Sequence, residues 1–138
     1  MKSELKYIAF NRDKSINELF FYTSIWKSEF EFIKIELSFL KLLIKTYPFK
    51  SKIPNMFEHL QLFILNIDKL EEDRNLILEN IELHRNQLSK KLKRNDLKHD
   101  DFNILTYDNL ADEIFNYLES YKNLKSKIYQ YINGLIAE

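Results

Sequence analysis

Three histidines, His59, His84 and His99, are the residues of this chain best suited to proton transfer or metal binding. His59 and His84 fall on the same expected helix, where a rise of about 1.5 Å per residue puts them roughly 38 Å apart. Two histidines so far apart cannot share a site within one chain. No serine or aspartate stands in a recognisable nucleophile motif, and the absence of cysteine excludes thiolate nucleophiles, disulfides and Cys-type zinc sites. We therefore expect a protein that is not an enzyme and needs no cofactor.

Acidic residues beside a histidine could bind a divalent metal ion. Helical bundles that hold two iron atoms use the spacing Glu-x-x-His, and neither histidine of the expected helices has a glutamate at that spacing. An acidic residue does precede the third histidine, as Asp96 before His99, with Asp100 and Asp101 following. Because this segment reads as a polar connection, where acidic side chains are usually solvated, we expect no metal site.

Arg74 and His84 interrupt an otherwise apolar row on the second expected helix. Folding the first helix back about a loop near residue 51 pairs residues whose numbers sum to about 102. This register places Arg74 near Glu29 and His84 near Glu18. A buried charge needs such a partner, so one hypothesis is a polar pocket at these four residues that binds a small anionic or polar ligand.

A structural explanation of Arg74 and His84 competes with the ligand pocket. The long side chain of Arg74 could reach solvent and pair with Glu71 three residues earlier. His84 could be half-exposed or bonded to Asn80. We favour this explanation and keep the ligand-binding bundle as the alternative function.

The composition excludes several classes of protein. Hydrophobic residues make up 45% of the 138 residues and charged residues 30%, which argues against both disorder and integration in a membrane. The single glycine, Gly134, cannot supply the tight turns of an all-β domain or a phosphate-binding loop. With 21 basic and 21 acidic residues, the net charge gives no reason to expect nucleic acid or an anionic membrane as partner. The N-terminus shows no signal peptide, so we expect a cytoplasmic protein.

A short basic run ends the second expected helix. It comprises Lys90, Lys91, Lys93 and Arg94, with Lys98 shortly after. Such a run could contact phosphates, but cations are also favoured at a helix C-terminus. We favour the second explanation because acidic residues follow closely, and nucleic-acid association is the weaker alternative.

Apolar residues spaced alternately by three and four define an inner seam on the first expected helix. Its members are Ile16, Leu19, Thr23, Trp26, Phe30, Ile33, Leu37, Leu40, Ile44 and Tyr47. A second row, which we call the outer row, consists of Phe21, Ile25, Phe32, Ile35, Phe39 and Leu42. We place this row beside the inner seam and expect the helix to be buried on a wide face against at least two neighbours.

The complete pattern predicts an all-α protein, a single domain over residues 1–138. Three long helices at about 16–46, 55–93 and 107–133 form an antiparallel up-down-up bundle, with a short N-terminal arm over residues 1–14. Expected caps are Asp13 or Ser15 (the latter with Glu18) for the first helix, Asn55 for the second and either Thr106 or Asp108 for the third. Gly134 should end the third helix in a left-handed conformation. We expect a non-catalytic protein that acts by protein–protein interaction or self-association, with a protein partner or a homodimer.

Overall fold

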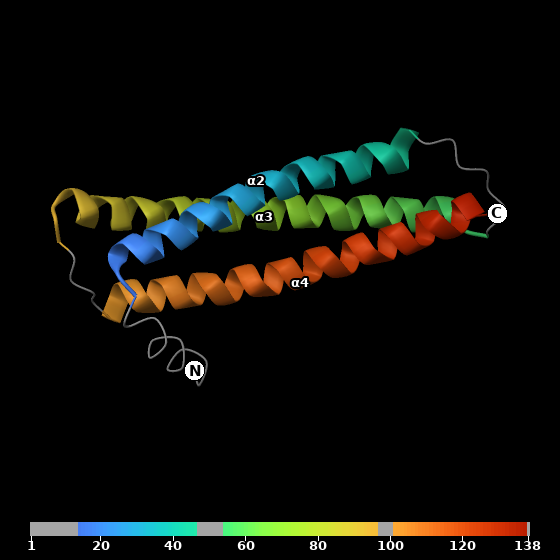
Figure 1. The fold of residues 1–138 in the computed structure, drawn as a ribbon. Helices are drawn as coiled ribbons and strands as arrows, with labels where there is room; N and C mark the ends of the chain where they lie inside the picture. The colour runs from blue at the N-terminus through green and yellow to red at the C-terminus, as the bar shows by residue number, and fades with distance from the viewer. Residues whose placement is uncertain (1–13, 47–53, 97–100, 138) are drawn as a thin grey trace.

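The computed structural model describes residues 14–46, 54–96 and 101–137. Its elements are α2 (Ile16–Thr46), α3 (Met56–Lys93) and α4 (Asp101–Ala137), which run up, down and up along one another (Figure 1). The predicted all-α bundle of three long helices is confirmed. The predicted N-terminal arm lies almost wholly outside the described residues.

The structure confirms the predicted cap of α2 and contradicts the predicted cap of α3. Ser15 caps α2 as predicted, because the Glu18 amide donates to Ser15 Oγ at 3.1 Å and the Ser15 amide to Glu18 Oε1 at 3.5 Å. Asn55 precedes α3 in a left-handed conformation with φ of 62° and makes no side-chain cap, so that prediction is wrong. Asparagine tolerates this conformation better than most residues.

α4 is longer than predicted at both ends. It begins at Asp101, so Thr106 and Asp108 lie inside the helix and do not cap it. It continues to Ala137 through Gly134, which has no positive φ, so the predicted left-handed ending is wrong as well. Apolar residues at helical spacing explain both extensions, because Ile104 and Leu135 are buried and their packing outweighs the local preferences of polar residues and glycine.

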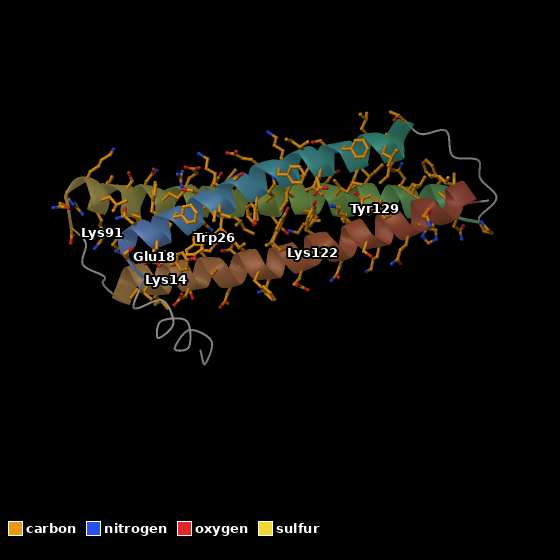
Figure 2. All side chains as sticks on the ribbon, viewed as in Figure 1. Lys14, Glu18, Trp26, Lys91, Lys122 and Tyr129 are labelled. Carbon is orange, nitrogen blue, oxygen red and sulfur yellow. The ribbon has the colours of Figure 1, made fainter. Side chains whose placement is uncertain are left out.

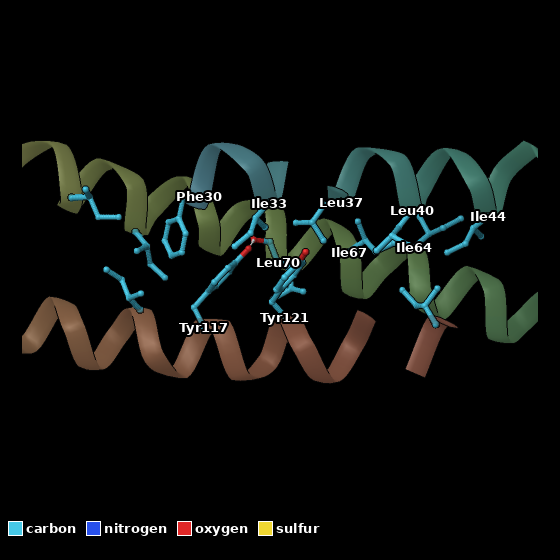
Figure 3. Close-up of a cluster of buried hydrophobic side chains, with 14 of the residues drawn as sticks. Phe30, Ile33, Leu37, Leu40, Ile44, Ile64, Ile67, Leu70, Tyr117 and Tyr121 are labelled. Atoms are coloured by element: carbon cyan, nitrogen blue, oxygen red, sulfur yellow. Dashed lines mark hydrogen bonds between the residues drawn. The ribbon is translucent and has the colours of Figure 1, made fainter. Parts of the chain in front are cut away.

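The core lies between the three helices. Figure 3 shows the inner seam from Phe30 to Ile44 meeting Ile64, Ile67 and Leu70 of α3. α3 packs closely against both other helices. α2 and α4 meet through side chains, among them the rings of Phe30 and Tyr117, whose centroids are 5.1 Å apart. The Tyr117 hydroxyl donates to the Leu70 carbonyl at 2.9 Å, which ties α4 to α3 (Figure 3).

The outer row differs most from the sequence-based expectation. All six of its side chains are exposed, with Phe32, Ile35 and Phe39 between 58% and 66% accessible. Successive residues of an α-helix are rotated by about 100° around the helix axis. Each residue of the outer row follows one of the inner seam by two positions, so the outer row lies nearly opposite the inner seam and not beside it. The two neighbours of a helix in a three-helix bundle occupy a single stripe of its surface. The inner seam fills that stripe, so the predicted wide buried face is wrong.

Within the described ranges, none of the helices is both long enough and apolar enough to cross a lipid bilayer. The basic and acidic residues that interrupt the apolar rows explain this. Lys41, for instance, lies between Leu40 of the inner seam and Leu42 of the outer row and pairs with Asp68 of α3 at 2.5 Å.

Candidate functional site

The outer row becomes a continuous seam when Ser28 is included. We call the outer row together with Ser28 the outer seam. Its positions are 21, 25, 28, 32, 35, 39 and 42, which alternate four and three residues apart without a break. This is the spacing by which one helix packs against another in a coiled coil. Side chains project from α2 on the side that faces away from α4 (Figure 2).

The area of the outer seam separates it from ordinary surface apolar residues. With large side chains that are mostly half to two-thirds exposed, its accessible apolar area is on the order of 700 Å². The largest apolar patch of a typical monomer covers about 300–600 Å². One side of a standard protein–protein interface buries about 800 Å². The outer seam therefore has the size of an interface.

Arg74 is buried in the α2–α3 interface, 5% exposed. Its Nη1 donates to the carbonyl oxygen of Phe30 at 3.1 Å and its Nη2 to Asn75 Oδ1 at 2.6 Å. Its Nε has no hydrogen-bond partner among the described residues. Glu29 is exposed and does not pair with it. The structure thus differs from both interpretations of Arg74, since this side chain neither faces Glu29 nor reaches solvent.

The ion pairs between α2 and α3 explain why the expected partners do not meet. Lys27 binds Glu82 at 3.0 Å, and Lys41 binds Asp68. These pairs shift α3 by about two helical turns from the expected register, and Figure 1 shows α3 continuing past the C-terminal end of α2. Glu18 accordingly lies at the α2 cap and is exposed, well away from His84.

His84 is a buried neutral histidine. It is 1% exposed, and its ring centroid lies 6.0 Å from that of Tyr107. Burial lowers the pKa of His84 from 6.5 to about 4, and nearby Gln87 offsets part of that shift. Neither ring nitrogen, nor Gln87 Oε1, has a partner with hydrogen-bond geometry among the described residues. Because both nitrogens are closed off from solvent, His84 cannot bind a metal or ligand without a rearrangement.

Shallow hollows line the groove between α3 and α4. One of about 310 Å³ is bordered by His84, Gln87, Thr106 and Asn109, among others. Another, of about 280 Å³, lies farther along the groove beside Asp73. Arg74 borders neither of them. Arg74, His84, Glu18 and Glu29 therefore do not converge on one pocket.

The remaining sequence candidates bring little chemistry together. Over the described ranges, no cluster of three or more histidine or acidic residues could hold a metal ion, while His99 and Asp100 lie outside those ranges. Lys91 of the basic run pairs with Asp96 at 3.7 Å. This contact fits a helix end whose charges are partly neutralised.

The sequence pattern identifies the residues of the outer row, but the prediction that they are buried beside the inner seam is wrong. The signal was available, because two seams with the same alternating spacing on one helix need two separate partners. Among the described helices, the inner seam is covered and the outer row is exposed. No family model matches this chain, and comparison with curated proteins and with solved structures also gives no match.

Proposed function

We propose that this protein is a non-catalytic helical bundle that binds another polypeptide chain along the outer seam of α2. The observation that carries the proposal is the exposed run of aromatic and aliphatic residues at unbroken coiled-coil spacing. A partner helix laid along this seam would insert its side chains between those of Ile25, Phe32 and Phe39. The lack of cysteine is compatible with a reducing compartment, and the proposal includes a cytoplasmic location.

The core supports this reading of the outer seam. The inner seam uses the same spacing and is buried against α3 and α4. The buried core is formed without the outer row, so folding does not explain why Phe32 and Ile35 are apolar. Exposed apolar surface of this extent normally marks a binding site.

Site-specific photo-cross-linking in the native cells tests the proposal. Ser28 is the polar position of the outer seam, so a photoreactive phenylalanine analogue there faces any bound helix without removing an apolar contact. The matched control carries the same group at Lys122, an exposed residue of α4. We expect a discrete cross-linked product from position 28 and none from position 122. Equal yields from both positions, or no product from position 28, would contradict the proposal.

Small-ligand binding is the second candidate function. The hollow of about 310 Å³ beside His84 favours it, since Gln87, Thr106 and Asn109 offer polar groups along its wall. Ligand-dependent shifts in the NMR signals of Thr106 and Asn109, on titration with metabolite pools, would support this candidate. Unchanged signals with all pools would leave the outer seam as the site.

A further inference from the structure

Resting on the proposed function, we infer that the outer seam binds a helix of a different protein, one that carries lysine or arginine beside its apolar positions. A second copy of this chain is not the occupant. The inference depends on the charges that flank the outer seam. In a coiled coil these flanking residues lie next to the partner and decide which partner is accepted.

The flanks of the outer seam are acidic through its middle. With Phe32 and Phe39 as a positions and Ile35 as a d position, the adjoining e and g positions hold Glu29, Glu36 and Glu31. Glu29 and Glu31 are exposed. Glu36 pairs with Lys125 of α4 at 2.7 Å, so Lys125 offsets the charge of this carboxylate. The other flanking residues are Tyr22, Ser24, Ser38, Leu43 and, at the C-terminal end, Lys45.

Three lysines lie one step farther from the outer seam, and two of them are engaged by acidic residues of α3. Lys27 and Lys41 point toward α3, where they bind Glu82 and Asp68. Lys34 is exposed and lies three residues after Glu31, so it offsets the charge on one side only. A partner helix would thus meet an apolar seam with an exposed carboxylate on each flank, Glu29 on one side and Glu31 on the other.

A second copy of the chain would place like charges together in either orientation. With the two seams antiparallel and Phe32 layered against Ser28 of the second copy, Glu31 faces Glu31 and Glu29 faces Glu29 of the second copy. With the seams parallel, Glu31 faces Glu36 of the second copy, where Lys125 offsets part of the repulsion. Like charges at these positions are unfavourable. A helix with basic flanks would instead gain opposite-charge contacts at the same positions.

Two synthetic helices that share one apolar core test the inference. Both are peptides of about four heptads with leucine and isoleucine at a and d. One carries lysine at every e and g position and the other glutamate, so that each peptide repels itself and stays monomeric. Their affinities for the full chain are measured by isothermal titration, and light scattering gives the mass of the chain alone.

We expect a single-chain mass, and at least about tenfold tighter binding of the lysine peptide than of the glutamate peptide. Salt should reduce this preference. The exposed double variant Glu29→Lys/Glu31→Lys should invert it, and Phe32→Gln/Phe39→Gln should abolish binding of both peptides. Circular dichroism checks that both variants remain helical.

The contrary results distinguish a failure of this inference from a failure of the proposed function. A dimer whose formation Phe32→Gln/Phe39→Gln prevents would overturn this inference while leaving the proposed function intact. Equal binding of the two peptides would do the same. If neither peptide binds, the inference is wrong, and the cross-linking at Ser28 then decides separately whether the outer seam binds any chain.

Discussion

Acidification should destabilise this bundle through His84. The pKa of His84 is about 4 in the folded chain and 6.5 as an unperturbed group. The unfolded chain therefore binds a proton at a higher pH than the folded chain does. Stability from the neutral ring is complete above about pH 6.5 and is lost as the pH falls toward 4.

The size of the effect follows from the difference between the two pKa values. One pKa unit corresponds to about 1.4 kcal/mol. At pH 5 the unfolded histidine is charged and the folded one is still neutral, so His84 lowers the free energy of unfolding by about 2 kcal/mol relative to pH 8. Near pH 4 and below, the loss approaches about 3 kcal/mol. For a chain of this length, 2 kcal/mol corresponds to a shift in Tm of about 6–8 °C.

Urea unfolding of the wild type and His84→Leu between pH 5 and pH 8 measures this contribution. Carboxylates titrate in both proteins, so the difference between them isolates His84. We expect the wild type to lose about 2 kcal/mol more than His84→Leu over this range. The exposed His59 provides the control, and His59→Gln should follow the wild type. If His84→Leu loses as much stability as the wild type, the ring is not buried and neutral as described.

The other predictions concern packing, the buried charge and the cap, all measured by chemical unfolding. Phe30→Ala should lower the free energy of unfolding by about 3–5 kcal/mol, because it empties part of the core. Phe32→Ala should change it by less than about 0.5 kcal/mol, because that ring is exposed. Similar losses for the two variants would place both rings in the core. Arg74→Met should leave the free energy of unfolding unchanged or raise it by about 1 kcal/mol, since Arg74 binds a backbone carbonyl and an amide but no carboxylate among the described residues. A loss above about 3 kcal/mol would reveal an acidic partner. Ser15→Ala should lower the free energy of unfolding by about 1 kcal/mol, because α2 loses its cap. An unchanged free energy of unfolding would show that the cap is frayed in solution.

The number and order of the helices could be predicted because apolar periodicity along a long helix is strong and local. The predicted helix ends are less accurate where tertiary packing competes with the local conformational preference of a residue. Ser15 with Glu18 was found because both halves of the capping box are in the sequence. The predicted left-handed ending at Gly134 is wrong, since helical continuation to the buried Leu135 outweighs the preference of glycine for a helix end.

The candidate site was harder to predict because it depends on register. Folding α2 back about its loop gives the correct direction of α3, but a displacement of about two turns changes every cross-helix neighbour. His84 consequently lies beside Tyr107 of α4, not near Glu18. Side-chain contacts such as Lys27 with Glu82 set this register, and a hydrophobic pattern that repeats every seven residues cannot select one such alignment over another.

The two seams of α2 also differ in how their polar residues are placed. Thr23 is buried in the inner seam and donates to the Phe20 carbonyl of its own helix at 2.6 Å, so it needs no partner from another element. Ser28 of the outer seam is exposed. A small polar residue inside a seam weakens nonspecific apolar association and can fix the alignment of a specific partner. With acidic flanks on both sides, the outer seam combines an interface-sized apolar area with features that oppose self-association. That combination supports the proposal that the outer seam binds one kind of helix, because surplus apolar residues left over from folding would not be expected to carry such features.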